Sequence, residues 1–199
     1  FLAWRYRRKL IVAKDPQSGA VVGELPFEGY VRGWSQFKPM DSDRILCRTY
    51  GRSGGLVWNP LSGEHATLAV SDLAEPTLQL HGGSCVSMTE QGDLVLWCPA
   101  DGNIVLQGSP RIFLRQRPVV LQAWLEEVAP NQVRGGSMVV VDHEGLAVRR
   151  SDGSVHEWHG AGDCRLHCIN DNGSLVVSSG TSVRVLGPYR PLGYTVAAD

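Results

Sequence analysis

The sequence predicts an all-β fold made of a repeated unit, and three observations support this prediction. Four similar turn motifs recur along the 199 residues: KDPQSGAVV, GGLVWNPLSGEHATL, WCPADGNIV and RRSDGSVHEW. The glycines that close them, Gly19, Gly63, Gly102 and Gly153, follow one another at intervals of 44, 39 and 51 residues. Short apolar or alternating runs flank each motif, which is typical of strands.

Each motif has a physical reason to form a turn between two strands. Pro16, Pro60 and Pro99 fix φ near the start of three of the turns, and proline cannot donate to a strand ladder. The closing glycine supplies a positive φ and lets the chain reverse into the next strand. Strands that lead into the turns are predicted at Leu10–Ala13, Leu56–Trp58, Leu94–Trp97 and Leu146–Val148.

A second, more polar turn accompanies these hairpins, as in DRILCRTYGRSGG and SCVSMTEQGD. One further strand is expected upstream of it, at Tyr30–Phe37, at Thr77–His81, within Arg111–Gln122 and at Cys164–Asn170. Four strands that repeat every 40 to 50 residues or so are typical of a β-propeller blade. A β-sandwich or a lipocalin-like barrel also has many short strands, but neither requires a turn at this interval.

The repeats predict one β-propeller domain over residues 1–199, with about four to five four-stranded blades in a complete or incomplete ring. Residues 1–28 are expected to supply only the last two strands of one blade. Four further blades are predicted at about 29–70, 71–108, 109–160 and 161–199. Since the sequence begins at Phe1, we expect a piece of a longer protein or a processed chain. Missing blades would then come from the rest of the protein or from another chain.

The motifs also resemble a known class of repeats. LVWNPLSGE and LIVAKDPQSGAVV are similar to the third strand, turn and fourth strand of WD40- or PQQ-type β-propellers, and CRLHCINDNGSLVVSSGTSVRVLG is similar to the inner half of a WD40 blade. The Gly-His and Trp-Asp dipeptides of WD40 blades are missing, because Asn59 follows Trp58 and Cys98 follows Trp97. The tryptophan docking motif of PQQ enzymes is not evident either. The resemblance therefore implies the architecture and no site residues.

Composition excludes several classes of function. The 19 basic and 20 acidic residues give a net charge of −1, which argues against binding of nucleic acid over the whole surface. No run approaches 18 apolar residues, so we expect no membrane-spanning helix. The five cysteines are odd in number and irregularly spaced, which favours reduced core thiols in a cytoplasmic protein. They are Cys47, Cys85, Cys98, Cys164 and Cys168.

The segment HEWHGAGDCRLHCIND holds the densest cluster of potential zinc ligands. Strand alternation is expected to place Cys164 and Cys168 on one face with Leu166, and His167 on the other. The groups therefore do not converge, and we predict core cysteines, no metal site and three surface histidines, His156, His159 and His167.

The sequence predicts no catalytic residue and no cofactor. Nucleophile and dinucleotide motifs are missing, and GRSGG at Gly51–Gly55 is more typical of a turn than of an anion cradle. Carboxylates at the turns could either meet at the mouth of a propeller channel or cap their own backbone. They are Asp15, Glu64, Asp93, Asp101, Asp142, Asp152 and Asp171.

The third complete unit is longer than its predecessor and contains a predicted insertion at residues 109–136. Apolar residues between Val120 and Val128 recur near helical spacing, with Pro118 and Pro130 as boundaries. We expect a short helical or irregular segment. It could form a binding face, as insertions in repeat folds often do, or cover its own blade.

The insertion carries the predicted partner-binding residues. If Arg111–Arg117 is a strand, alternation places Arg111, Phe113, Arg115 and Arg117 on one face, near Trp124. Basic and aromatic residues together suit an acidic partner, and stacking on bases is a weaker option. A second basic run at the start of the chain keeps that weaker option open; it consists of Arg5, Arg7, Arg8 and Lys9.

These observations predict a non-enzymatic scaffold for protein–protein interaction, with a partner held on the rim loops and the 109–136 insertion. The alternative is a propeller that binds a small molecule or glycan at its channel mouth, with or without catalysis. That alternative would use the turn carboxylates and the histidines. Neither prediction identifies a partner or a ligand, because fold alone does not define function.

Overall fold

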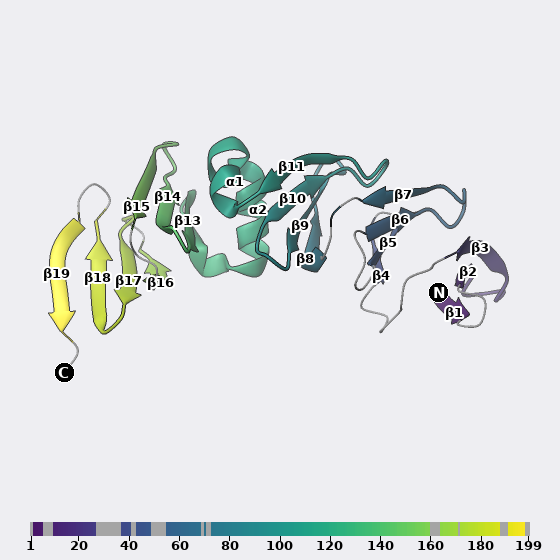
Figure 1. Cartoon of the computed structure of the whole chain (residues 1–199), viewed down its shortest axis with the longest axis horizontal. Coiled ribbons are helices and arrows are strands. Elements are labelled where there is room, and N and C mark those ends of the chain that lie inside the picture. The colour runs from purple at the N-terminus through teal and green to yellow at the C-terminus, as the bar shows by residue number, and fades with distance from the viewer. Residues whose placement is uncertain are drawn as a thin grey trace. The chain divides into compact units, whose positions relative to one another are not determined.

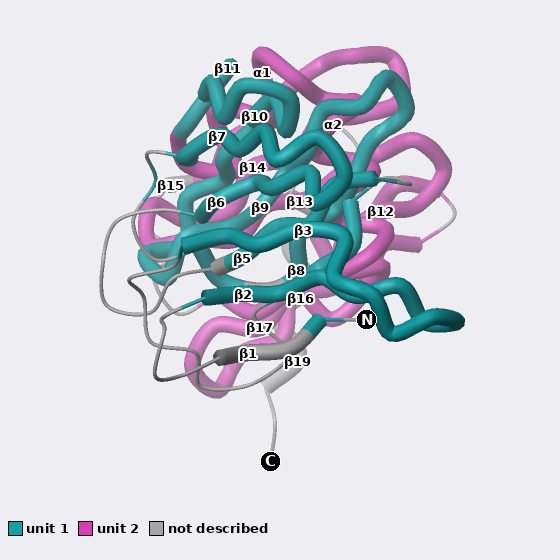
Figure 2. The backbone as a smooth tube through the Cα atoms, turned by 90° about the vertical axis from the view of Figure 1, so that its right-hand side faces the viewer, with its two compact units in different colours: residues 1–107 teal, residues 108–199 magenta. Residues whose placement is uncertain are grey.

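The structure of the protein is a computed structural model, shown in Figure 1. It describes residues 2–5, 10–26, 37–40, 43–48, 55–68, 70, 73–159, 164–170, 172–187 and 191–197. The chain divides into two compact units, residues 1–107 and 108–199 (Figure 2). That both units belong to one domain stays a prediction. The strand expected at Tyr30–Phe37 lies outside the described residues except for Phe37, as do Gly51–Gly54, Asp171 and residues 6–9 of the basic run.

The first unit contains three antiparallel sheets in which each strand lies beside its neighbours in the chain. The first sheet consists of β1 (Leu2–Arg5), β2 (Leu10–Lys14) and β3 (Val21–Pro26). The second consists of β4 (Phe37–Pro39), β5 (Ile45–Arg48), β6 (Gly55–Trp58) and β7 (His65–Leu68). The third consists of β8 (Leu73–Gln79), β9 (Cys85–Thr89), β10 (Leu94–Trp97) and β11 (Ile104–Gly108).

The second unit begins with helices and continues with two four-stranded sheets. The helices are α1 (Pro110–Gln116), α2 (Pro118–Val128) and the 3-10 turn η3 (Pro130–Gln132). The fourth sheet follows, with β12 (Val133–Arg134), β13 (Ser137–Asp142), β14 (Gly145–Arg149) and β15 (Val155–His159). The fifth has β16 (Cys164–Ile169), β17 (Leu175–Ser179), β18 (Ser182–Leu186) and β19 (Pro191–Ala197). Within the described part of the chain, no helix is long and apolar enough to cross a membrane.

Four-stranded sheets in simple chain order confirm the predicted all-β, propeller-type architecture. Whether the sheets close a ring stays a prediction. Two expectations are wrong. The first sheet has three strands rather than two, because Leu2–Arg5 also pairs with β2. The strand expected within Arg111–Gln122 is replaced by α1 and α2, and the fourth sheet takes its first strand from Val133–Arg134 instead.

The recurring turn has one hydrogen-bond pattern in the first three sheets. Gly19 N donates to Asp15 O at 2.9 Å, and Asp15 N donates to Ala20 O at 2.9 Å. The same pair of bonds closes the turns that begin at Asn59 and at Cys98. The fourth motif is one residue shorter, with Arg150 N bonded to Ser154 O. In the second, third and fourth sheets this turn joins the third strand to the fourth, so the motifs occupy matching places.

Side chains at the start of two of these turns satisfy the backbone of the turn. Asp15 Oδ1 accepts hydrogen bonds from Gln17 N at 2.9 Å and Ser18 N at 2.7 Å. Asn59 Oδ1 accepts from the two equivalent amides, at 2.9 and 3.1 Å. Aspartate and asparagine share this role because each offers an oxygen that reaches amides two and three residues ahead.

Alternation along the strands of the second sheet buries both of its faces. In β6, Val57 joins a cluster with residues of the third sheet, whereas the adjacent Trp58 joins a cluster with residues of the first. Leu46 and Cys47 of β5 divide in the same way, and all four side chains are at most 2% exposed. The sheets of this unit therefore stack face to face. In the second unit the fourth and fifth sheets share one apolar cluster.

Glycine permits close approach where one sheet meets the turn of the next. A Cβ added to Gly23 in β3 would lie 2.2 Å from the carbonyl oxygen of Pro60, in the turn of the second sheet. A Cβ added to Gly102, in the turn of the third sheet, would lie 2.6 Å from the Thr67 oxygen in β7. Each turn thus packs on the last strand of the sheet before it.

A long cationic side chain connects the first strands of successive sheets in each unit. Lys38 Nζ in β4 donates to the Thr77 carbonyl in β8. Arg134 Nη1 in β12 donates to the Ile169 carbonyl in β16 at 3.3 Å. Both accepting strands carry an irregularity next to the acceptor, between Ala74 and Thr77 and between Leu166 and Cys168. A bulge disrupts the ladder locally and leaves backbone groups available to other donors.

We expect Gly23→Ala to lower the free energy of unfolding by about 2 kcal/mol, because the added methyl group overpacks a backbone contact. Urea unfolding followed by tryptophan fluorescence measures this change. Gly19→Ala is the control: its Cβ has no neighbour within 4 Å and only its φ of +71° opposes the substitution. We expect a loss of about 1 kcal/mol for the control. Wild-type stability of Gly23→Ala would contradict the close contact.

Candidate functional site

The helical insertion is the candidate site, and its own sequence determines where its helices begin. Pro110 and Pro118 occupy the first turns of α1 and α2, where proline's missing N–H has no cost. Helix α2 begins at Pro118 and ends at Val128, which confirms the predicted helical insertion. Apolar side chains from both helices form its interior, and five of them are at most 5% exposed: Phe113, Leu114, Leu121, Trp124 and Leu125.

Helix α1 lies on the face of the fourth sheet that does not contact the fifth. Strand register shows this, because Leu146 pairs with Trp158 on the face shared with the fifth sheet. Asp142 and Glu157 lie on the opposite face, where the arginines of α1 meet them. The sequence left two alternatives for the insertion, a binding face or a segment that covers its own sheet. The contacts of α1 support the second alternative.

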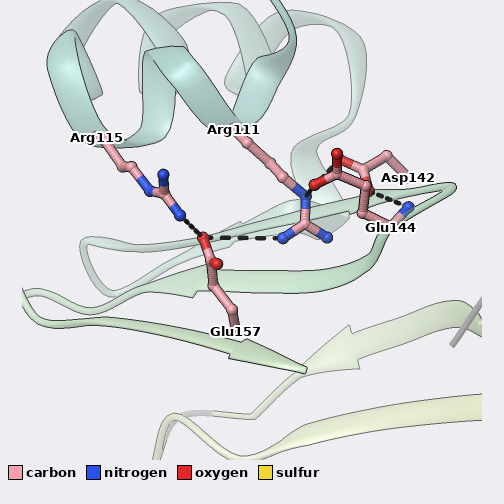
Figure 3. A network of polar contacts seen from close by, with 5 residues as sticks. All are labelled: Arg111, Arg115, Asp142, Glu144 and Glu157. Atoms are coloured by element: carbon pink, nitrogen blue, oxygen red, sulfur yellow. Dashed lines mark hydrogen bonds and ion pairs between the residues drawn. The ribbon is translucent and has the colours of Figure 1, made fainter. Parts of the chain in front are cut away.

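Five charged side chains attach α1 to this sheet and are called the insertion network (Figure 3). Arg111 Nε donates to Asp142 Oδ2 at 2.6 Å, and lies 3.6 Å from Glu144 Oε2. Arg115 Nη2 donates to Glu157 Oε1 at 2.5 Å. Arg111 Nη1 is 3.8 Å from the same Glu157 oxygen, which joins the two halves of the network.

Arg111 is the buried centre of the insertion network. Its side chain is 6% exposed and that of Asp142 is 17% exposed. Its hydrogen bond to Asp142 raises the pKa of Arg111 further, although burial opposes the charge. Burial also opposes ionisation of Asp142, but the hydrogen bonds from Arg111 and from Glu144 N outweigh it and lower the Asp142 pKa. Both groups therefore stay charged at neutral pH, and the pair is fixed in place.

The residues predicted to bind a partner do not share a strand face. Arg111 and Arg115 are four residues apart on a helix and point to one side of it, whereas Arg117 lies between the helices. Phe113 and Trp124 are 0% and 1% exposed. They therefore pack inside the insertion and do not present a surface. That this set binds a partner stays a prediction.

Val119 in α2 is 79% exposed, and the surface around it is called the outer side of the insertion. Ile112 and Val128 are 36% and 37% exposed, but Val128 is nine residues from Val119 and therefore points to the opposite side of α2. The exposed Arg117, two residues before Val119 in the chain, adds positive charge to the outer side. The sequence analysis did not select these apolar residues. It assigned 111–117 to a strand and therefore chose the aromatic side chains near the arginines.

Several turn carboxylates cap their own backbone, as one of the two sequence alternatives held. Asp101 Oδ1 accepts from Asn103 N at 3.0 Å, and Asp152 Oδ1 accepts from Ser154 N at 2.8 Å. The same kind of bond lowers the pKa of Asp15, through Ser18 N, and lowers that of Asp101 through Asn103 N. Hydrogen bonds from Ser154 lower the pKa of Asp152.

The strand face predicted for Cys168 is wrong. A bulge in β16 pairs Leu166 with Val177 but Cys168 with Val176, so Cys168 leaves the face that Leu166 shares with Cys164. The extra residue is His167, whose Nε2 lies 2.8 Å from Ser178 Oγ. Among the residues that the structure describes, no group of three or more His, Cys, Asp or Glu side chains could hold a metal ion.

The prediction of core cysteines is confirmed for Cys47 and Cys85 and is wrong for Cys98, Cys164 and Cys168. Cys47 and Cys85 are 0% exposed, and the other three are partly exposed. Burial raises the pKa of the Cys47 thiol to about 12. Since the thiolate is the reactive form, this cysteine acts as a small apolar side chain rather than as a nucleophile.

Comparison with known proteins finds similarity to solved structures alone. No protein-family model and no curated protein matches the sequence. Among solved structures, BamB from Moraxella catarrhalis is similar at 10% identity and a TM-score of 0.35, over 96% of this chain and 59% of BamB. The C-terminal WD40 domain of Sif2 is similar at 11% identity and a TM-score of 0.37, over 94% and 54% of the two chains. The chain therefore spans less than two thirds of either structure.

Arg111→Met should lower the free energy of unfolding by about 3 kcal/mol, because it leaves Asp142 partly buried and without its cation. Arg115→Met is the matched control, since an exposed pair contributes about 0.5 kcal/mol. Urea denaturation of both variants measures the difference, and a double-mutant cycle with Asp142→Asn isolates the pair. Equal effects of the two arginine substitutions would contradict the central role of Arg111.

Acid should weaken the protein in a defined pH range. The folded-state pKa of Asp142 lies below its unfolded value of about 3.9. Its contribution to stability is therefore present above that value and is lost as the pH falls through the folded pKa. We expect the unfolding free energy to decrease below about pH 4, and Asp142→Asn to make that decrease shallower. An unchanged slope in this variant, measured by urea unfolding at pH 2.5 to 5, would contradict the assignment.

Proposed function

We propose that the protein is a non-enzymatic module for protein–protein interaction and that its partner docks on the outer side of the helical insertion. One observation carries the proposal: the insertion is attached to its sheet by a buried ion pair, yet it leaves Val119 79% exposed. An apolar side chain that stays exposed on a rigid support can be covered by a partner without first being ordered.

The chemistry of this outer side favours a partner with an apolar patch beside acidic residues. Val119 offers apolar area, and the exposed Arg117, two residues before it in the chain, offers charge near it. Arginine often contributes strongly at protein interfaces, whereas exposed charge at the rim mainly guides association. The partner surface predicted from the sequence thus moves from Phe113 and Trp124 to neighbours of the same insertion.

The alternative function, a ligand site at a channel mouth, needs turn carboxylates that are available to a ligand. Asp15, Asp101 and Asp152 instead accept hydrogen bonds from their own turns. Asp142 is paired with Arg111. We therefore favour the interaction module. None of the five cysteines forms a disulfide, which supports the further proposal that the protein acts in the cytoplasm.

Val119→Glu should weaken partner binding at least tenfold, which corresponds to about 1.4 kcal/mol, because it places a charge in the apolar contact. The partner is first identified by affinity purification from the source cells and then purified, and its affinity is measured by calorimetry. Leu61→Glu is the matched control, since Leu61 is 71% exposed but lies in the turn of the second sheet. We expect the control to bind normally. If both variants bind like wild type, the docking surface lies elsewhere.

A further inference from the structure

The turn between β16 and β17 contains an asparagine followed by glycine, and this dipeptide occurs once in the sequence, at Asn172 and Gly173. The backbone nitrogen after an asparagine can attack the side-chain amide, and glycine permits this most readily because it has no Cβ to hinder the approach. Asn172 is exposed, so water reaches it. The other four asparagines precede larger residues or proline: Asn59, Asn103, Asn131 and Asn170.

The folded turn holds the nitrogen that would attack. Gly173 N donates to Asn170 O at 2.8 Å, and Asn170 N donates to Ser174 O at 2.8 Å. Two side chains add to the turn, because Asn170 Nδ2 donates to Ser174 Oγ at 2.8 Å and Asn172 Oδ1 accepts from Ser174 N at 3.0 Å. Gly173 N is therefore committed while the turn is closed, and it becomes available when the turn opens locally.

The fourth sheet contains the same kind of turn with an aspartate in place of Asn172. Gly153 N donates to Arg150 O at 2.9 Å, and Ser154 N donates to Asp152 Oδ1 at 2.8 Å. Hydrogen bonds from Ser154 lower the pKa of Asp152, so this carboxyl group is ionised at neutral pH. An ionised carboxylate is a poor target for a nucleophile, whereas the neutral amide of Asn172 is a better one. The two turns therefore share their hydrogen bonds but differ in reactivity.

We propose that Asn172 is a site of spontaneous deamidation and that opening of the β16–β17 turn controls its rate. In the open turn Gly173 N loses its proton to solvent base and forms a bond to Asn172 Cγ, and the Cγ–Nδ2 bond breaks as ammonia leaves. Water then opens the resulting succinimide ring at either carbonyl carbon, which yields aspartate or isoaspartate. The net reaction consumes water and releases ammonia. This site is separate from the insertion and does not depend on the function proposed for it.

The two products differ in their effect on the fifth sheet. Aspartate keeps the turn, because Asp152 makes the equivalent bond to Ser154 N. Isoaspartate adds a carbon to the backbone of a turn whose flanking residues, Ile169 and Leu175, pair with each other. Both of these side chains belong to the apolar cluster shared by the fourth and fifth sheets. Isoaspartate at this position should therefore weaken the cluster.

The test is incubation of the full chain in mildly alkaline buffer, either folded or unfolded in urea, followed by peptide mapping with mass spectrometry. We expect Asn172 to react first among the asparagines of the unfolded chain, and at least tenfold more slowly in the folded chain. The Asp101–Gly102 and Asp152–Gly153 steps are internal controls that should form isoaspartate more slowly than Asn172 does. Equal rates in the folded and unfolded chains would overturn the proposal, and so would an unreactive Asn172 in the unfolded chain.

One substitution separates the turn from the reacting residues. Asn170→Ala removes the side-chain bond to Ser174 but leaves the asparagine–glycine step unchanged. We expect this variant to deamidate about threefold faster than wild type when folded, because the turn opens more easily, and at the same rate when unfolded. Asn103→Ala is the matched control, since it removes a side-chain bond to Asp101 in the turn of the third sheet. The control should react like wild type, and a folded Asn170→Ala that also does so would contradict control by the turn.

Discussion

The structure depends on the burial of both faces of each central sheet. Adjacent residues of one strand, such as Val57 and Trp58, belong to different apolar clusters because successive side chains point to opposite faces. A sheet with two apolar faces is stable only when a neighbour covers each of them. The sheets must therefore stack on one another, because a sheet without neighbours would expose its apolar faces to water. Hairpins alone would expose the large side chains that this arrangement buries completely, including Trp58 and Trp97.

The same requirement explains the position of the insertion. The fourth sheet has buried residues on both faces, since Val139 contacts the cluster shared with the fifth sheet and Val140 points the other way. Helix α1 packs on that second face. The buried pair of Arg111 and Asp142 sets its position there, because a helix on a sheet needs directional contacts as well as apolar ones to define one orientation. The insertion is thus attached to its sheet by apolar packing and by a buried ion pair together.

The sequence sufficed for features that arise from neighbours in the chain. The recurring turns, their glycines and helix α2 were predictable because prolines, glycines and apolar spacing act within a few residues. The segment 111–117 was ambiguous, since arginines spaced by two suit a strand face and the pair four apart suits a helix. Asp142 and Glu157 could not be assigned to these arginines, because they lie 31 and 42 residues away in the chain. The bulge at His167 could not be predicted either, because the residues around it in the sequence look the same as those of a regular strand.

The cationic links between first strands have a consequence for the evolution of the chain. Lys38 donates from the second sheet to the third, and Arg134 donates from the fourth to the fifth, always toward the later sheet. Each acceptor lies beside a bulge in the receiving sheet. The two sheets of each pair are therefore not interchangeable, because one supplies the cation and the other supplies the carbonyl. Recombination that exchanged or reversed the two sheets of a pair would separate each cationic side chain from the carbonyl that it contacts, so the order of the sheets is constrained as well as their individual sequences.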